Sequence, residues 1–248
     1  MIAIVSDIHS NLEALAAVLE DINRYDTEAI YCLGDTIGYG PNPRECVTLA
    51  MDWHLVLLGN HDHAVLYEPK DFNPIAEEAT RWTRSQLENP LPDQDSVDRR
   101  WQFIAELPVG HNEDDILFVH GSPRQPLNEY VFPPDVRNRN KMERLFELVS
   151  KFCFLGHTHV PGIFTESYDF IYPTDDASSH VVVEGKVMCN VGSVGQPRDG
   201  DWRACYVLFD GEAIHYRRVE YDVATTVKKI HNIPELDRFL GDRLLNGK

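Results

Sequence analysis

The sequence predicts an α/β protein with two β-sheets, formed by a single domain over residues 1–248. The first half of the chain alternates short β-branched runs with amphipathic stretches, a pattern typical of parallel strands joined by helices. After Gly162, apolar and polar residues alternate at the period of strands in an antiparallel or mixed sheet. No repeat, low-complexity tract or linker divides the 248 residues, which favours one domain over two.

The first three strands and two helices follow one another closely. The run at Ile2–Val5 predicts a strand, and apolar residues at helical spacing predict a helix over residues 11–25. The second strand is expected in AIYCLGD, a helix over residues 44–53, and the third strand in HLVLLGN. This β-α-β-α-β order predicts parallel strands with helices packed on the sheet.

The remaining elements are predicted in the same way. Residues 74–107 show helical spacing that the loop-forming run ENPLPDQD breaks into two helices. DILFVHG predicts a buried strand, RNKMERLFELVS a helix, and FCFLGHTH another strand. Four later runs, GIFTESYDFIY, HVVVEGKVMCNVGSVG, RACYVLFD and EAIHYRRVEYD, predict hairpin strands, and residues 223–233 and 234–245 return to helical spacing.

The formal net charge of −17 at pH 7 restricts the class of partner. Bulk nucleic acid is a polyanion, so it would be repelled unless the protein offered a local positive site. A bound divalent cation would be one such site. We interpret the other acidic residues as a solvated surface.

The cysteines and the N-terminal residues indicate the compartment. The five cysteines form no CxxC pair, and four of them lie in apolar, strand-like runs, as is typical of reduced thiols in a protein core. MIAIVSD lacks the basic segment of a signal peptide, and no run approaches the roughly 18 apolar residues of a membrane span. The sequence therefore predicts a soluble, cytoplasmic protein.

Five of the predicted strands end at Asp, His or Asn. The carboxyl ends of strands in an α/β sheet lie along one edge, where ligands bind, so we expect these side chains to gather. Singly, each could be a turn-former, and the two neighbouring histidines could be a hydrogen-bonded core pair, although burying unpaired imidazoles is costly. The set comprises Asp7, His9, Asp35, Asn60, His120, His157 and His159.

This mixture of carboxylate, imidazole and amide oxygen suits borderline or hard divalent ions such as Mn²⁺, Fe²⁺ or Zn²⁺. Seven ligands exceed what one ion normally takes from a protein. They suit two ions roughly 4 Å apart that share one carboxylate and keep open positions for water. The set contains no thiolate, which argues against a structural zinc site rich in cysteine.

In chain order, the motifs are Asp7-x-His9, Gly34-Asp35, GNHD at residues 59–62, His120, and Gly156-His157-x-His159. They resemble the five-part signature of the calcineurin-like metallophosphoesterases, and the strand-rich remainder is similar to the second sheet of that superfamily. Each motif is weakly specific alone, whereas all five in this order are highly specific. The loop GDTIGYGPNP and the later NVGSVGQPRDGD are similar to stretches of the small prokaryotic YfcE-like phosphodiesterase branch.

The resemblance implies a four-layer αββα sandwich of two mixed sheets with a dinuclear metal centre. Mn²⁺ is the first choice for the two ions, with Fe, Zn, Ni or Co as alternatives. A water bridging both ions would attack phosphorus, and His61 would protonate the leaving alkoxide or stabilise the charge that develops on it. The implied ligands of the first ion are Asp7, His9, Asp35 and His159, and those of the second are Asp35, Asn60, His120 and His157.

One stretch departs from the pattern of the superfamily. Its protein Ser/Thr phosphatases carry GDxxDRG, in which the second Asp orients the acid histidine and the Arg binds phosphate. Here the stretch is GDTIGYG, so Gly38 and Tyr39 take those two places. This departure weakens the protein-phosphatase interpretation and leaves the partner of His61 unidentified.

Candidate substrate contacts each have a structural alternative. Asn11 stands where a helix N-cap belongs, although a helix end facing the site would also favour phosphate. Arg124 and Arg198 could clamp a substrate anion or be solvated surface arginines. Ser193 lies between Gly192 and Gly195, which could form a tight turn or bring backbone amides to the phosphate.

The sequence thus predicts a metal-dependent phosphoesterase, with a phosphodiesterase favoured. The substrate would be a small phosphoester or a nucleotide. A phosphomonoesterase, a protein phosphatase, a nucleotide pyrophosphatase and a non-catalytic scaffold of the same fold are the alternatives. A homo-oligomer stays open, because exposed apolar faces cannot be located from the sequence.

Overall fold

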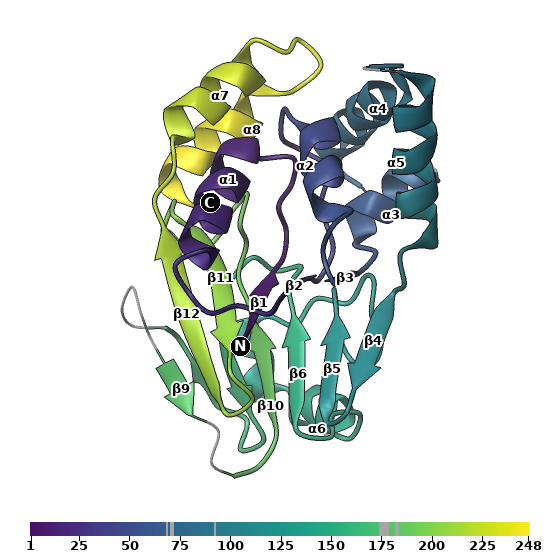
Figure 1. The fold of residues 1–248 in the computed structure, drawn as a ribbon. Helices are drawn as coiled ribbons and strands as arrows, with labels where there is room; N and C mark the ends of the chain where they lie inside the picture. The colour runs from purple at the N-terminus through teal and green to yellow at the C-terminus, as the bar shows by residue number, and fades with distance from the viewer. Residues whose placement is uncertain (68, 70–71, 92, 174–178, 182–183) are drawn as a thin grey trace.

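The chain builds two β-sheets that face each other, with helices on their outer sides, and each sheet takes strands from both halves of the chain (Figure 1). The computed structural model describes residues 1–67, 69, 72–91, 93–173, 179–181 and 184–248. In this part of the chain each sheet has six strands.

The first sheet has the strand order β3-β2-β1-β11-β12-β9. β1, β2 and β3 are parallel neighbours, as the β-α-β-α-β pattern predicts, and β11 joins β1 in antiparallel fashion. β11 and β12 form an antiparallel pair, and β9 adds to the far side of β12. The bounds are β1 Ile2–Val5, β2 Ala29–Cys32, β3 Leu55–Val56, β9 Ser179–Val181, β11 Ala204–Phe209 and β12 Ala213–Val219.

The second sheet has the order β4-β5-β6-β10-β7-β8. β5, β6 and β10 are parallel neighbours, whereas β4, β7 and β8 pair in antiparallel fashion, so this sheet is mixed too. The bounds are β4 Gly110–Glu113, β5 Ile116–Val119, β6 Phe152–Leu155, β7 Gly162–Thr165, β8 Phe170–Ile171 and β10 Val187–Asn190.

The helices mostly begin at Asn or Asp residues whose side chains accept a hydrogen bond from the first turn, as at Asn73 and Asp222. In Figure 1 the last two helices lie beside the first one, so both ends of the chain contribute to one helical layer. The bounds are α1 Leu12–Ile22, α2 Pro43–Ala50, α3 Asn60–Leu66, α4 Pro74–Glu88, α5 Gln94–Glu106, α6 Arg139–Phe146, α7 Val223–His231 and α8 Arg238–Asp242, with 3₁₀ turns at Pro133–Arg137 and Arg243–Asn246.

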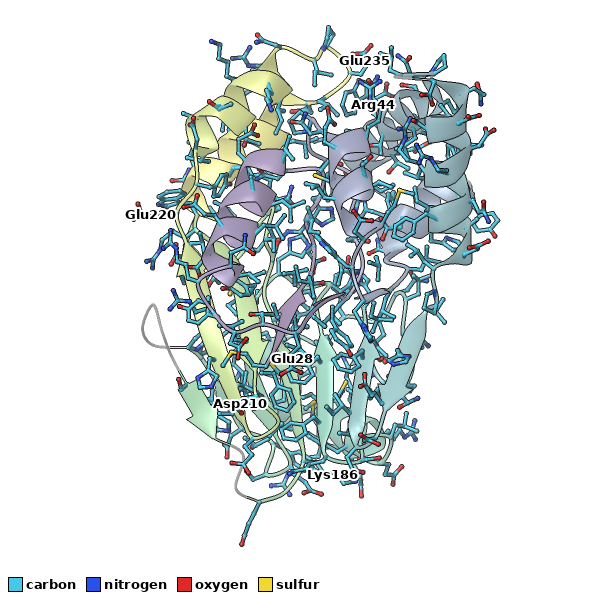
Figure 2. All side chains as sticks on the ribbon, viewed as in Figure 1. Glu28, Arg44, Lys186, Asp210, Glu220 and Glu235 are labelled. Atoms are coloured by element: carbon cyan, nitrogen blue, oxygen red, sulfur yellow. The ribbon has the colours of Figure 1, made fainter. Side chains whose placement is uncertain are left out.

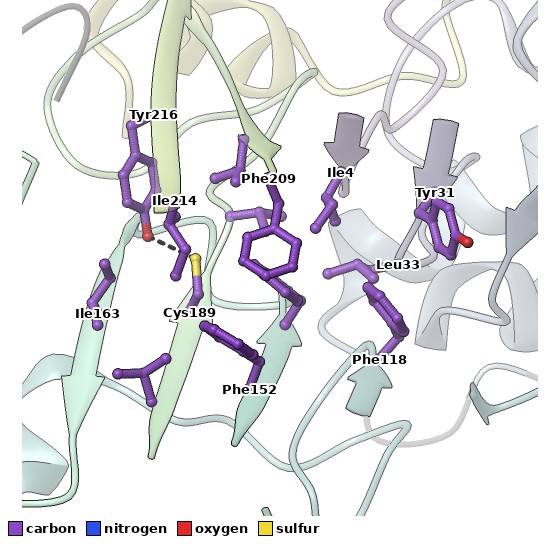
Figure 3. Packing of buried hydrophobic residues seen from close by; sticks show 14 of the residues in the cluster. Ile4, Tyr31, Leu33, Phe118, Phe152, Ile163, Cys189, Phe209, Ile214 and Tyr216 are labelled. Atoms are coloured by element: carbon purple, nitrogen blue, oxygen red, sulfur yellow. Dashed lines mark hydrogen bonds between the residues drawn. The ribbon is translucent and has the colours of Figure 1, made fainter. Parts of the chain in front are cut away.

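The main core lies between the two sheets. Figure 3 shows Ile4 and Tyr31 of the first sheet facing Phe118 and Phe152 of the second. Neighbouring residues of the same strands point outward: Ala3 packs against α1, and residues of β6 pack against α6. The order of layers is therefore helix, sheet, sheet, helix, and both faces of each sheet are covered. The predicted four-layer αββα sandwich is confirmed.

We expect Phe154→Ala to lower the free energy of unfolding by roughly 3–5 kcal/mol, because the substitution leaves a cavity in a close-packed core. Phe154 is 0% exposed and stacks on Phe118 at 5.6 Å between ring centroids. Denaturant unfolding followed by circular dichroism would measure the change. Phe239→Ala, at a ring that is 52% exposed, is the matched control and should cost much less. Equal losses in the two variants would contradict this account.

One predicted run contributes strands to both sheets. The run from residue 180 to residue 195 predicts strands of an antiparallel or mixed sheet, and β9 and β10 lie in different sheets. β10 pairs in parallel with β6, whose register places Asn190 beside Leu155, and in antiparallel fashion with β7. β6 and β10 are buried along their whole length, as expected for central strands. Part of the run, residues 182–183, lies outside the described residues.

Cysteines and charges follow the predicted distribution. The five cysteines are free and buried. Carboxylates such as those of Glu28, Asp210, Glu220 and Glu235, labelled in Figure 2, are exposed, which agrees with a solvated acidic surface. Among the described residues, no helix has the length and apolar character needed to cross a membrane.

Candidate metal centre

The seven candidate ligands lie in loops or helix starts just after β1, β2, β3, β5 and β6. Three of these strands belong to the first sheet and two to the second. The ligands were expected along the edge of one sheet, but they come from the neighbouring strand ends of two sheets. The seven side chains are buried, from 0% exposed at Asp7 and His120 to 9% at Asn60. Together they form a cluster of buried polar side chains.

The backbone of this region is strained. Asp7, His9, Asp35, His157 and His159, which are five of the seven candidate ligands, have φ between 48° and 65°. Side chains in this left-handed region cost about 1–3 kcal/mol each and persist only where the surroundings enforce them. The fold thus holds these five side chains in directions that an ordinary strand end would not give.

The first group of ligand atoms joins Asp7, His9 and His159. His9 Nε2 lies 3.1 Å from His159 Nε2, which in turn lies 3.1 Å from Asp7 Oδ1. Asp7 Oδ2 accepts a hydrogen bond from the backbone N–H of His157, whereas Asp7 Oδ1 is buried without a hydrogen-bond partner among the described residues. A buried carboxylate oxygen left in this way is expected where a cation binds.

The second group joins Asp35, Asn60, His120 and His157. His120 Nε2 lies 3.0 Å from Asn60 Oδ1 and 3.1 Å from His157 Nδ1. Asp35 Oδ2 lies 3.5 Å from His120 Nε2 and 3.6 Å from His9 Nε2, so this oxygen faces both groups. Asp35 Oδ1 accepts a hydrogen bond of 2.8 Å from the backbone N–H of His61.

The outer nitrogens of the four imidazoles fix their tautomers. Each outer nitrogen faces a backbone carbonyl, which can only accept, so that nitrogen carries the proton. The inner nitrogens of His9 and His159 are then unprotonated, and their lone pairs face each other across 3.1 Å. The inner nitrogens of His120 and His157 face each other in the same way, also across 3.1 Å. The outer partners are Ile37 for His9, Leu33 for His120, Asn128 for His157 and Gln196 for His159.

The protonation states suit cation binding. Burial lowers the pKa of His157 to about 2 and that of His159 to about 4, and it also lowers the pKa of His9 and His120. These rings are therefore neutral near pH 7, and each facing pair of lone pairs requires a positive charge between them. Among the described residues, three groups could hold a metal ion: Asp7, His9 and His159; Asp35, His120 and His157; and His9, Asp35 and His61.

His61 lies beside both groups but is held differently. Its Nδ1 is buried without a hydrogen-bond partner among the described residues. Its ring packs against Tyr39 at 4.3 Å, Phe72 at 4.7 Å and the edge of His9 at 4.9 Å between centroids. Packing between aromatic rings therefore sets the orientation of His61, and an oxygen of the Asp35 carboxylate lies within 4.8 Å of a nitrogen of the ring.

A match to a protein-family model identifies the superfamily of this chain. The family model described as the calcineurin-like phosphoesterase superfamily domain matches residues 1–213. The chain belongs to the calcineurin-like phosphoesterase superfamily. Members of this superfamily are generally hydrolases and typically bind divalent metals, and the groups described above provide candidate ligands.

Individual relatives agree with this membership. An uncharacterized protein of Methanocaldococcus jannaschii is 38% identical over 263 residues, covering 100% of this chain and 98% of its own. The crystal structure of a metallophosphoesterase from Sphaerobacter thermophilus has a TM-score of 0.84 and 37% identity, covering 100% of this chain and 99% of that chain.

The position that bears the orienting carboxylate in the protein phosphatases of the superfamily is Gly38 here. A Cβ at Gly38 would lie 2.7 Å from His61 Nδ1, and φ at this residue is +96°. Asp62, the neighbour of His61, points elsewhere: its carboxylate accepts from the backbone N–H groups of Ile37 and Gly59. Burial raises the pKa of Asp62 to about 6. Asp62 thus fastens the GNHD loop to the loop after β2.

Gly156 lies where a side chain would collide with the segment after β1. A Cβ there would lie 2.2 Å from Ser6 Oγ and 2.5 Å from Asp7 Oδ2, so any side chain would push Asp7 away. The glycine therefore lets the loop after β6 reach the loop after β1, as expected from its place before the two histidines.

Two predicted substrate contacts are occupied within the protein. Asn11 Oδ1 caps α1 by accepting from the N–H of Ala14, and its Nδ2 donates to the Gly195 carbonyl and the Tyr221 hydroxyl. Arg124 forms an ion pair with Glu129. These contacts favour the structural alternative for both residues.

Ser193 and Arg198 lie closer to the ligand groups. Ser193 Oγ donates to the backbone carbonyl of Asp7 at 2.7 Å and is fully buried, so it positions a candidate ligand. Arg198 donates from Nη2 to Gln196 Oε1, and its charge acts on the nearby Tyr39 phenol. The buried Nε of Arg198 has no hydrogen-bond partner among the described residues. After burial, the charge of Arg198 is the next cause that lowers the pKa of His61 and His159.

Three side chains near the site were not predicted. Tyr39 packs on His61, and Tyr130 stacks on His157 at 3.8 Å between centroids. Arg243, near the C-terminus, lies close enough to Arg198 that burial, followed by the charge of Arg198, lowers its pKa to about 10. The stretch GDTIGYG, which differs from the GDxxDRG of the protein phosphatases, could have drawn attention to Tyr39. Nothing in the local sequence pointed to Tyr130 or Arg243.

Proposed function

We propose that this protein is a metal-dependent phosphodiesterase of the cytoplasm that uses two divalent cations, with Mn²⁺ the first choice. One observation carries this proposal. In each ligand group two unprotonated imidazole nitrogens face each other across 3.1 Å, and Asp35 Oδ2 faces both groups. The proposed ligands of the first ion are Asp7, His9, Asp35 and His159, and those of the second are Asp35, Asn60, His120 and His157.

The chain's own residues would divide the work of hydrolysis. When bound, the cations would lower the pKa of water and neutralise the phosphoryl oxygens. Arg198 would hold the phosphoryl group through its unpartnered Nε, since that N–H is buried beside the ligand groups. His61 would protonate the leaving oxygen or stabilise the charge that develops on it by donating a hydrogen bond, and the rings of Tyr39 and Phe72 would keep it in place.

A diester is favoured over a phosphoprotein because of what surrounds His61. Gly38 and Tyr39 replace the orienting Asp and the phosphate-binding Arg of the superfamily's protein phosphatases. The cationic group that the site offers instead is Arg198, from a different loop. A singly charged diester needs fewer cationic contacts than a doubly charged monoester.

We expect the chelated protein to regain hydrolysis of bis(p-nitrophenyl) phosphate when Mn²⁺ is restored, with two ions bound per chain. The experiment combines a phosphoester screen with elemental analysis of the same sample, and it compares Mn²⁺ with Fe²⁺, Zn²⁺, Ni²⁺ and Co²⁺. Faster turnover of p-nitrophenyl phosphate would favour the phosphomonoesterase alternative. Tight metal binding without hydrolysis of any phosphoester would indicate a non-catalytic scaffold of the same fold and would contradict the proposal.

A further inference from the structure

The segment that follows β5 carries two exposed aromatic rings that the proposed chemistry does not use. Tyr130 is 42% exposed and Phe132 is 44% exposed. Their rings are stacked, with centroids 5.2 Å apart and planes 8° apart. Val131 between them is buried against the second sheet, so the two aromatic rings project from the same side of an extended segment.

This pair of rings is attached directly to the candidate metal centre. Tyr130 also stacks on His157, with centroids 3.8 Å apart and planes 20° apart. His157 donates from Nε2 to the backbone carbonyl of Asn128 in the same segment. His157, Tyr130 and Phe132 therefore form a ladder of near-parallel rings that runs from a proposed ligand of the second ion to the protein surface.

The segment is held rigidly enough to serve as a preformed surface. Lys141 Nζ donates to the Tyr130 carbonyl at 2.7 Å and also contacts Asp135 at 2.7 Å. Asp135 accepts a hydrogen bond of 2.8 Å from the backbone N–H of Phe132. In the described part of the chain, the ring contact of Phe132 is the one with Tyr130, so its outer face has no aromatic partner.

A cationic side chain and the aromatic ladder both lie beside the ligand groups. Arg198 donates its backbone N–H to the His159 carbonyl, beside the proposed first ion, and its charge is close enough to Tyr130 to oppose the rise that burial gives the pKa of that phenol. The aromatic ladder lies on the side of the proposed second ion, beyond His157. A ligand that spans the site would thus place its anionic group by Arg198 and a flat, apolar group on the ladder.

We propose that Tyr130 and Phe132 form a stacking platform for a nucleobase, which makes the substrate a nucleotide. The proposal rests on the proposed phosphodiesterase function and names the substrate class of that site. Aromatic rings bind every base through its π-face, and only a ribose separates base from phosphate in a nucleotide. The net charge of −17 favours a mononucleotide ester over a long polyanionic strand.

The kinetic test uses two substrates that differ only in the base: adenosine 5′-methylphosphate and methyl ribofuranoside 5-methylphosphate, followed by ³¹P NMR with Mn²⁺-loaded protein. We expect the adenosine ester to have the higher kcat/KM. Phe132→Leu, which keeps an apolar side chain, should lower kcat/KM for the adenosine ester about tenfold and leave the ribose ester unchanged. Tyr172→Leu, at another exposed ring (56%), is the matched control and should change neither. Equal losses on both esters, or no loss on either, would overturn the platform.

A binding measurement separates this inference from the proposed function. Saturation-transfer NMR with adenosine and the metal-free protein needs neither hydrolysis nor a phosphate. Transfer to the base protons that disappears in Phe132→Leu but persists in Tyr172→Leu supports the platform even if no ester is hydrolysed. Absence of transfer in the unaltered protein overturns it. A dimer in sedimentation velocity that Phe132→Leu dissociates would assign the rings to contact between copies and also overturn the platform.

Discussion

Asp35→Asn should reduce hydrolysis of bis(p-nitrophenyl) phosphate by about 10³-fold or more and lower the number of bound metal ions. Asp35 Oδ2 is the oxygen that faces both ligand groups, at 3.5 Å from His120 Nε2 and 3.6 Å from His9 Nε2. Replacing the anionic carboxylate with a neutral amide removes the charge that the two cations would share. Metal ions contribute several kcal/mol of transition-state stabilisation, and each 1.36 kcal/mol is a factor of ten in rate.

The measurement pairs steady-state kinetics with elemental analysis of the same preparation. Asp98→Asn, at an exposed carboxylate on α5, is the matched control and should keep full activity. A thermal unfolding curve would establish that the Asp35 variant is folded. Unchanged turnover in a folded Asp35→Asn protein would remove the shared carboxylate from the mechanism.

His61→Ala should lower turnover by roughly 10²–10⁴-fold while leaving metal content nearly intact, because its proposed role is proton transfer. The loss should be larger for an ester with an alkoxide leaving group than for bis(p-nitrophenyl) phosphate, since p-nitrophenolate leaves without protonation. His111→Ala, at a side chain that is 41% exposed, is the control. His61 also belongs to a candidate metal group with His9 and Asp35, so metal content discriminates between the two roles.

Gly38→Ala tests the position of His61 without removing its imidazole. The added Cβ would lie 2.7 Å from His61 Nδ1, so the ring must move away from its present place. We expect the same pattern as in His61→Ala: reduced turnover, retained metal and a greater loss on alkyl esters. Loss of metal in either variant would assign His61 to the ligands, and full activity in both would exclude it from the reaction.

The candidate metal centre was accessible from the sequence because strand ends leave a local mark. Each apolar run stops at Asp7, Asp35, Asn60, His120 or His157, and a buried strand that ends at a polar group places that group at the edge of a sheet. The structure brings these residues, with His9 and His159, within contact distance. The helices other than α3 were predictable for a similar reason, since the 3.6-residue period and the capping residues are local features. The short helix α3, Asn60–Leu66, was not predicted.

Strand pairing was less accessible. Strands such as β6 and β10 are apolar on both faces. The sequence of such a strand does not indicate which other strands it pairs with. The sequence predicted one sheet edge, whereas the ligands come from the ends of β1 to β3 in one sheet and β5 and β6 in the other. For the same reason, the run after residue 180 did not indicate that β9 and β10 belong to different sheets.

Side-chain roles outside the motifs depended on partners distant in the chain. Asn11 is bonded to Gly195 and Tyr221, about 200 residues away, and no local pattern predicts that its amide is already used. Ser193 reaches back to Asp7 in the same way. Tyr130 gained its proposed role only when the fold placed it against His157.

The sequence by itself determined the types and order of the groups that could hold metal, because that chemistry depends on residue identity at the ends of buried strands. The tertiary structure decided that two sheets supply those groups, that packing orients His61, and that Arg198 and Tyr130 come to lie beside the site. Those outcomes follow from long-range packing, which depends on the shape of the whole core and leaves no periodic signal in the chain.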